Sequence, residues 1–437
     1  MQYKELKGPR QVLYAVGHIG PGMLNQFITT WLLVYLSGEG NTLLSAALVG
    51  VCLMLGRIMD AVSDPLVANW SDRMTDHRWG RRLPFMIFGT VPMIIGFNML
   101  WYTQMLPGTV LRFIWVAVGV NLFYFSYTVV VNPYFALLPE IAQDKKQRTF
   151  IQSFVAFFGI LGMGIAMGAS GFLIDAMGFQ TAGIVMSLIC ALTMAGPILT
   201  VRKRPDAPRV ETEKSSANIL VSLKNALANK TFRTYIFGFC IFYLGFQLVQ
   251  YNLAFITTVL LGLDKSMSST MFIASVVAAI FMIPVYNLIM KRVSCAGALK
   301  IAICAYVVVA ILIALIPVIV GMGTNGMTLG FTLMVLLGFP YSGLMVIPNV
   351  IIAEIIDEDI AVNHMHREAL FFGVQGLINK FMVSLAALVV GMLQTAFGNT
   401  VASPAGVILV GPVAALISVV GFFFINRLHI ASGEKQA

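Results

Sequence analysis

The chain has 437 residues and a mean hydropathy of +0.86, with 58% hydrophobic and only 11% charged residues. This balance excludes an ordinary soluble globular domain and indicates an integral membrane protein. The net charge of +9 is the charge expected of basic loops in such a protein, so it gives little support for a nucleic-acid partner.

Twelve apolar runs along the chain are long enough to cross a hydrocarbon core of about 30 Å as helices. The runs are continuously apolar, whereas the strands of a membrane barrel alternate, so they predict an all-α membrane protein. The charged stretch before the first run lacks a small-residue cleavage site, so we expect no cleaved signal peptide. The expected spans are 11–36, 43–70, 83–105, 110–138, 150–174, 180–200, 233–262, 268–290, 297–319, 326–354, 369–396 and 404–426.

The longest polar segment, 201–232, separates two sets of six spans, 1–200 and 233–437. We expect it to be a cytoplasmic linker that contains a short amphipathic helix at 219–227. Basic loops recur after the second span ("SDRMTDHRWGRR") and the eighth ("KRVSCAGALK"). This pattern is typical of a two-domain transporter with a binding site between its halves. The span count alone also fits a channel or a membrane enzyme.

All but four of the 28 Lys and Arg residues lie at the chain ends or in loops that follow even-numbered spans. By the positive-inside rule, both termini are therefore expected in the cytoplasm. No organelle address is visible, which favours a bacterial inner membrane, and we expect a monomer. The five cysteines show no CxxC spacing, so we expect packing roles, no cofactor and no metal beyond a coupling cation.

The second span carries three ionisable side chains, Arg57, Asp60 and Asp64, at a spacing that places them on one helix face. A charge inside a membrane costs about 2.5–3.5 kcal/mol on insertion scales, so it usually faces a cavity or a partner. Two converging carboxylates predict either a proton-titrating pair or an oxygen site for a cation. The alternative is a structural ion pair in which Arg57 neutralises both aspartates.

Two further ionisable residues lie inside expected spans. Lys380 lies about a dozen residues into the eleventh span, too deep for easy snorkelling to the surface. We expect it to alternate between a solute and the carboxylates Asp60 and Asp64; a purely structural pairing is the alternative. His18, among glycines of the first span, either packs in the core or lines the cavity.

Charged residues also gather at the expected cytoplasmic ends of the spans. We expect salt bridges among them to close the cytoplasmic side of an outward-facing state, with ordinary solvated loop ends as the alternative. The candidates for this gate are Asp72, Arg73, Arg81, Arg82, Glu140, Arg148, Asp357 and Arg367.

Four stretches resemble the glycoside–pentoside–hexuronide:cation symporters of the major facilitator superfamily. They are "DAVSDP" (60–65), "RWGRRLPF" (78–85), "NPYFALLPEIAQDKKQR" (132–148) and "REALFFGVQGLINK" (367–380). The likeness covers the chain in the same order. It implies the fold of that superfamily in two six-helix halves and no enzymatic activity. It also implies alternating-access uptake of a sugar or sugar derivative, coupled to Na⁺ or H⁺, with Li⁺ also accepted as the coupling ion.

The resemblance further implies a cation site. The two family aspartates match Asp60 and Asp64, and the threonine of the fourth span matches Thr128. Ser63 stands where the family has an asparagine, which leaves the choice among Na⁺, H⁺ and Li⁺ open.

On the solute side, the resemblance places Val131 and Gly22 where characterised family members have sugar-binding aspartates. Losing both carboxylates while keeping a lysine favours an anionic solute; a neutral glycoside is the alternative. A carrier of lysolipids or other amphiphiles with the same fold is the second functional hypothesis. The expected solute contacts are Lys380, Gln375, His18, Phe135 and Arg57.

Overall fold

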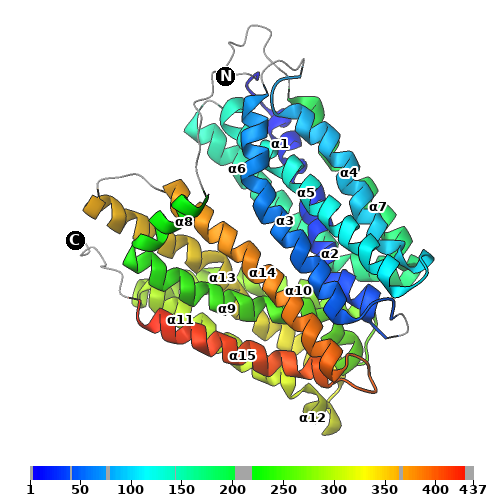
Figure 1. The fold of residues 1–437 in the computed structure, drawn as a ribbon. Helices are drawn as coiled ribbons and strands as arrows, with labels where there is room; N and C mark the ends of the chain where they lie inside the picture. Colours follow the sequence, from blue (N-terminus) through cyan, green and yellow to red (C-terminus); the bar gives the residue numbers. More distant parts are fainter. Residues whose placement is uncertain are drawn as a thin grey trace. The chain divides into compact units, whose positions relative to one another are not determined.

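The computed structural model describes residues 3–39, 42–74, 79–142, 144–201, 219–363 and 368–428. The regular elements in this part of the chain are all helices (Figure 1). The chain divides into two compact units, Met1–Ser215 and Ser216–Ala437, and each is described by itself. Most of the expected linker, residues 202–218, lies outside the described residues.

The N-terminal unit begins with two helices separated by a turn at Gly17 and His18. The hydroxyl of Ser45 caps the third helix by accepting a hydrogen bond from the Leu48 amide, the usual way to satisfy a free amide at a helix start. The helices are α1 (Pro9–Val16), α2 (Ile19–Ser37), α3 (Ala46–Arg73), α4 (Leu83–Trp101), the short η1 (Thr103–Met105), α5 (Thr109–Ile141), α6 (Lys145–Gly168) and α7 (Ser170–Thr200).

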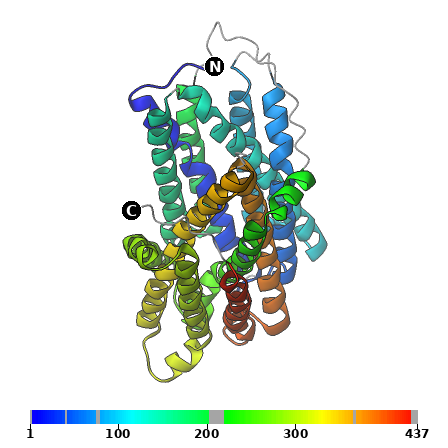
Figure 2. The same ribbon diagram turned by 90° about the vertical axis from the view of Figure 1, so that its left-hand side faces the viewer.

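The C-terminal unit begins with the short helix expected in the linker, which packs on α9 and α14. Its helices are α8 (Ile219–Ala228), α9 (Lys230–Phe255), the π-helical turn η2 (Ile256–Leu260), α10 (Lys265–Arg292), α11 (Cys295–Ala314), α12 (Ile316–Gly321), α13 (Gly326–Asn363), α14 (Glu368–Phe397) and α15 (Ala405–Asn426). Both ribbon views show the long helices of each unit running side by side (Figures 1 and 2).

The two units repeat one pattern of helix pairing. In the N-terminal unit α5 packs against α3 and α4, and α2 packs against α6 and α7. In the C-terminal unit α13 packs against α10 and α11, and α9 packs against α14 and α15. Each of these helices has the same rank among the long helices of its own unit, so the fold is an internal repeat of the kind that transporters use.

Eleven helices in the described residues are long and apolar enough to cross a membrane. They correspond to the second through twelfth expected spans. The first expected span, 11–36, is divided into α1 and α2 because the chain turns at Gly17 and His18. Polar residues such as Asn25 and Gln26 also lower the hydropathy of α2.

Three other boundaries differ from those expected. The ninth span breaks at Leu315, because Pro317 lacks the amide that would continue the ladder of α11. The tenth extends to Asn363, since nothing between Pro348 and that residue interrupts a helix. Ala169 separates α6 from α7 inside the fifth expected span, while the turn expected before residue 180 occurs at Gly178, whose φ is 78°.

A glycine sets the close approach of α3 to α5. A Cβ atom on Gly56 would lie 2.3 Å from Val120 Cγ1 and 2.6 Å from Tyr124 Cδ2. Both of these neighbours are fully buried, so neither has room to withdraw. Only glycine allows this contact, which brings the face of α3 that follows Gly56 against the matching face of α5.

Candidate functional site

Asp60 lies at the interface of α3 and α5, where only 2% of its surface is exposed. Its Oδ1 accepts a hydrogen bond of 2.8 Å from the Thr128 hydroxyl of α5. Thr128 is itself 1% exposed. A carboxylate buried in a membrane-spanning helix is costly unless it is paired or functional, so this pair marks the centre of the candidate site.

Asp64 lies one turn further along α3 and contacts α5 in the same way. The Asn132 side-chain amide donates to Asp64 Oδ1 at 3.1 Å and to the Asp64 backbone carbonyl at 3.3 Å. Asn132 was not among the residues expected at the site. The sequence nevertheless indicates it, because Asn132 follows Thr128 by four residues, as Asp64 follows Asp60. This spacing places Asn132 on the same face of its helix as Thr128.

Ser63 is buried beside the aspartates, but its hydroxyl bonds locally. It donates to the Asp60 backbone carbonyl at 3.2 Å, a helical back-bond that needs no ligand. Its oxygen keeps a free lone-pair direction, since a hydroxyl that donates can still accept or coordinate.

Arg57 is held by groups of α2 and α5. Its Nη2 donates to the Thr29 hydroxyl at 3.2 Å, and its guanidinium carbon lies 4.6 Å from the centre of the Tyr124 ring. The Tyr124 hydroxyl in turn donates to Asn25 Oδ1 at 3.2 Å. These contacts fix the arginine in place through a hydrogen bond and a cation–π interaction.

The charges of α3 converge on one side chain of α5. Tyr127 interacts electrostatically with Asp60, Arg57 and Asp64. Two carboxylates and one guanidinium give a net charge of −1 when all are ionised, which one monovalent cation balances. Among the described residues, no group of three or more His, Cys, Asp or Glu forms a candidate metal site. The donors present are oxygens of carboxylates, hydroxyls and carbonyls, which suit a hard cation.

His18 and Phe135 lie together in the N-terminal unit. Their ring centres are 5.1 Å apart in an edge-to-face arrangement, and His18 also stacks near Tyr134 at 5.9 Å. The His18 ring forms no hydrogen bond with a described residue, and Phe135 is 38% exposed. The structure therefore places these two expected solute contacts side by side.

Gln375 and Lys380 lie on α14 of the C-terminal unit. Gln375 is buried, and its Oε1 accepts a hydrogen bond of 3.0 Å from the Tyr235 hydroxyl. A Cβ atom on Gly373 or Gly376 would meet open space, so the helix backbone is accessible beside Gln375. The expected pairing of Lys380 with Asp60 or Asp64 joins the two units and stays a prediction.

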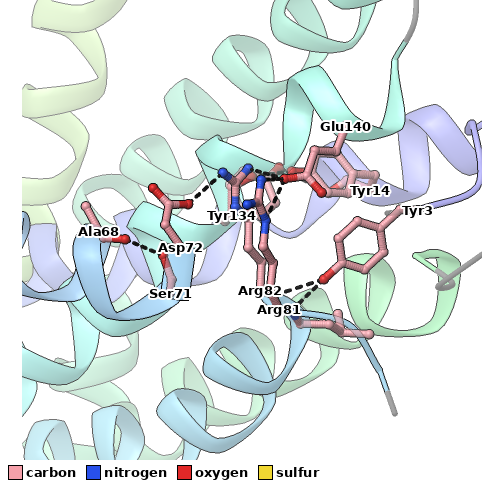
Figure 3. A network of polar contacts seen from close by, with 10 residues as sticks. Tyr3, Tyr14, Ala68, Ser71, Asp72, Arg81, Arg82, Tyr134 and Glu140 are labelled. Atoms are coloured by element: carbon pink, nitrogen blue, oxygen red, sulfur yellow. Dashed lines mark hydrogen bonds and ion pairs between the residues drawn. The ribbon is translucent and has the colours of Figure 1, made fainter. Parts of the chain in front are cut away.

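Four expected gate residues form one network in the N-terminal unit, at the end where α3 stops and α4 starts (Figure 3). We call this the α3–α4 end. Glu140 Oε1 accepts a hydrogen bond of 2.5 Å from Arg81 Nη2, and it lies 2.9 Å from Arg82 Nη1. Arg82 Nη2 also bonds Asp72 Oδ1 at 3.1 Å. Arg81, Arg82 and Glu140 are buried, so their two ion pairs are shielded from solvent, whereas the side chain of Asp72 is 41% exposed.

An aromatic residue missed by the sequence analysis completes the network. The hydroxyl oxygen of Tyr3 accepts the backbone amides of Arg82 at 2.9 Å and Leu83 at 3.4 Å, so it caps the start of α4 (Figure 3). Tyr3 is 1% exposed, and burial raises the pKa of its hydroxyl. No motif indicated this role, because Tyr3 precedes the first helix and contacts residues almost eighty positions away.

The other gate candidates lie outside this network. Arg73 is exposed, and Arg148 donates to the Ala142 carbonyl at 3.0 Å. Asp357 is exposed on α13 of the C-terminal unit, and Arg367 lies outside the described residues. A closure that joins the two units therefore stays a prediction.

Comparison with known proteins finds a family model that matches most of the chain. Residues 13–427 match the family model described as "MFS/sugar transport protein". An uncharacterised symporter of Synechocystis is 34% identical over 160 residues, which cover 35% of this chain and 28% of the relative. The sodium-dependent lysophosphatidylcholine symporter 1 of Mus musculus is 24% identical over 390 residues, covering 80% of this chain and 70% of the relative.

Solved structures agree on the fold. The nucleoside transporter NupG superposes with a TM-score of 0.68 over 97% of this chain and 99% of that chain. The identity is 13%, so this likeness shows the fold alone.

Proposed function

Because the chain belongs to the MFS/sugar transport protein family, as the resemblance to the glycoside–pentoside–hexuronide:cation symporters predicted, we propose that it is a cation-coupled symporter. It imports a sugar or sugar derivative by alternating access and catalyses no reaction. The downhill entry of the ion drives the uptake of the solute.

The observation that carries the proposal is the buried Asp60–Thr128 pair, followed one turn later by Asp64–Asn132. Repeated carboxylate–polar pairs across two membrane-spanning helices give a cation several oxygen ligands without a further charge. The coupling ion is Na⁺ or H⁺, and Li⁺ also binds to the same oxygens. Ser63 and Thr128 complete the donor set.

The solute contacts come from both units: His18, Phe135 and Arg57 from the first, Gln375 and Lys380 from the second. Lys380 and Arg57 favour a solute with a carboxylate or sulfonate, because a charge-assisted hydrogen bond in a partly desolvated site contributes about 1.5–3 kcal/mol. The protein acts as a monomer in a bacterial inner membrane. The α3–α4 end, which carries the basic network, faces the cytoplasm together with both termini.

A lysolipid carrier is the second candidate function. It is favoured by the likeness to the mouse lysophosphatidylcholine symporter, which extends over 80% of this chain. Such a carrier keeps the same cation site and transports an amphiphile in place of a sugar.

The ion site is tested without knowledge of the solute. Purified full-length protein is heated with increasing Na⁺ at constant ionic strength, and the melting temperature is recorded. A ligand that binds only the folded state raises this temperature as its concentration increases. We expect the increase in wild type and its loss in Asp60→Asn and Asp64→Asn. Asp175→Asn, at an exposed carboxylate of α7, is the matched control and keeps it.

The solute class is tested by the same measurement with melibiose, a phenyl glucuronide and lysophosphatidylcholine as probes, followed by uptake into vesicles. The proposal is supported by a sugar derivative that raises the melting temperature more in Na⁺ than in choline. The same compound must accumulate in vesicles when Na⁺ enters down its gradient. If Asp60→Asn and Asp64→Asn accumulate it as well as wild type does, the cation assignment is wrong.

A further inference from the structure

An apolar hollow lies on the N-terminal unit, apart from the aspartates and the arginine network. It has a volume of about 240 Å³ and is formed by α3, α4 and α5. Its walls include Trp70 and Met74 at the end of α3, and Phe85, Phe88 and Pro92 along the first turns of α4. Trp70 is 55% exposed and Phe88 63% exposed, so the hollow opens to the outside.

The hollow is suited to hydrocarbon and unsuited to water. Its lining is almost entirely apolar, with Ser126 of α5 as the polar exception. Water in a cavity needs several polar partners, which this lining does not supply. The three helices are all long and apolar enough to span a membrane. A hollow with this lining, open at the surface of such helices, suits a hydrocarbon chain.

The length of the hollow and the position of Trp70 suit the part of a lipid where the acyl chain joins the headgroup. It reaches from Pro84 to Pro92, which is roughly 12 Å at 1.5 Å per residue of helix. Tryptophan favours the boundary between hydrocarbon and headgroups, and Trp70 lies one turn before the end of α3. The hollow therefore runs from the headgroup boundary into the hydrocarbon.

A cation lies next to one wall of the hollow. Arg73 follows Trp70 by three residues, so the two side chains are neighbours on the surface of α3. It is exposed and forms no hydrogen bond or ion pair with a described residue. The neighbouring Asp72 is paired with Arg82, which offsets its negative charge.

We propose that this hollow binds one acyl chain of an anionic bilayer phospholipid, whose net negative headgroup pairs with Arg73. The site is separate from the cation and solute sites and does not depend on which solute is carried. One basic side chain near an anionic lipid surface contributes about 1 kcal/mol, which is a roughly five-fold preference over a zwitterionic lipid.

The test uses Trp70 as its own reporter. Wild type and Trp70→Phe are reconstituted in phosphatidylcholine vesicles that contain increasing fractions of brominated phosphatidylglycerol or brominated phosphatidylcholine. Bromine quenches tryptophan on contact, and the fluorescence difference between the two proteins isolates Trp70. We expect the brominated phosphatidylglycerol to bind about five-fold more tightly than the brominated phosphatidylcholine.

Two pairs of variants separate headgroup from chain, each measured with and without Trp70→Phe. Arg73→Gln removes the preference, whereas Arg10→Gln, at another exposed arginine of the N-terminal unit, retains it. Phe88→Ala removes a wall of the hollow at an exposed position and lowers phosphatidylglycerol binding at least two-fold. Phe172→Ala, an exposed aromatic of α7 outside the hollow, leaves it unchanged.

Equal quenching of Trp70 by the two brominated lipids in wild type overturns the proposal. So does a preference that survives Arg73→Gln, or one that is unaffected by Phe88→Ala. A third titration uses brominated lysophosphatidylcholine. If that lipid quenches Trp70 more strongly and displaces phosphatidylglycerol, the hollow binds a single-chain amphiphile and the proposal is overturned.

Discussion

At the scale of single residues, the Thr128 hydroxyl donates a hydrogen bond of 2.8 Å to the Asp60 carboxylate. Thr128→Val keeps the shape of the side chain and removes that hydroxyl as donor and ligand. A hydrogen bond to a charged group contributes about 1.5–3 kcal/mol, so we expect the apparent Na⁺ affinity to fall roughly ten-fold or more. The measurement is the Na⁺ titration of the melting temperature.

The matched control for Thr128→Val is Thr90→Val on α4. Thr90 is also buried, but its hydroxyl only donates to the Met86 carbonyl of its own helix. We expect unchanged Na⁺ affinity in that variant. Equal losses in the two variants show a general packing effect and contradict the role given to Thr128.

Tyr3 acts on a helix end through one oxygen. Tyr3→Phe leaves the Arg82 and Leu83 amides without their acceptor. A net hydrogen bond contributes about 1 kcal/mol, so we expect roughly five-fold faster amide hydrogen exchange in the first turn of α4. Exchange in the first turn of α11, capped by Ser294 in the other unit, serves as the internal control.

The same tyrosine gives a pH dependence whose sign follows from burial. Burial raises the pKa of Tyr3 above its usual value of 10.0, so the folded state favours the protonated hydroxyl. The stabilisation is fully present below pH 10 and is lost as the pH rises through the raised value. We expect the stability difference between wild type and Tyr3→Phe to be constant from neutral pH to about pH 9 and to shrink above pH 10. A difference that shrinks below pH 8 contradicts this.

At the scale of elements, the proposed cation site depends on how closely α3 approaches α5. Gly56→Ala removes no functional group, yet its Cβ overlaps the buried Val120 and Tyr124. Overpacking of this kind costs about 1–3 kcal/mol and separates the two helices. Because Thr128 follows Tyr124 by one turn, we expect both a lower melting temperature and a weaker response to Na⁺.

Gly164→Ala is the matched control for Gly56→Ala, since a Cβ there meets open space on α6. Alanine at that position is expected to leave the melting temperature unchanged or raise it slightly, because it lowers the helix-forming cost. An unaltered Na⁺ response in Gly56→Ala rules out helix spacing as the determinant of the site.

At the scale of the whole molecule, the proposed ion contacts and part of the proposed solute contacts belong to different units. Asp60 and Asp64 belong to the first, and Gln375 and Lys380 to the second. Linkage requires Na⁺ to raise the solute affinity by the same factor by which the solute raises the Na⁺ affinity. Calorimetry of wild type with a glucuronide that binds is expected to give equal factors of about 5–150.

The variants distinguish the two partners of this coupling. Lys380→Ala is expected to lose glucuronide binding while the Na⁺-dependent melting temperature remains. Asp60→Asn is expected to lose the Na⁺ response. Glucuronide binding that persists in Lys380→Ala, or competition by neutral glycosides alone, contradicts an anionic solute.

The sequence by itself determined the membrane class, eleven of the long helices and the face shared by Arg57, Asp60 and Asp64. Hydropathy and a 3.6-residue period are local properties, so they can be read along the chain. Family resemblance assigned Asp60 and Thr128 to one cation site, and the structure shows the hydrogen bond between them. Asn132 was within reach of the same helical spacing and was overlooked.

Tertiary structure alone decided which expected partners meet. Asp72, Arg81, Arg82 and Glu140 converge because α3 and α5 end where α4 starts, whereas Arg73, one residue beyond Asp72, is exposed. Tyr3 reaches the start of α4 and Phe88 joins Trp70 around one hollow through packing between distant segments. Such contacts depend on helix rotation and close approach, which a pattern along one chain does not encode.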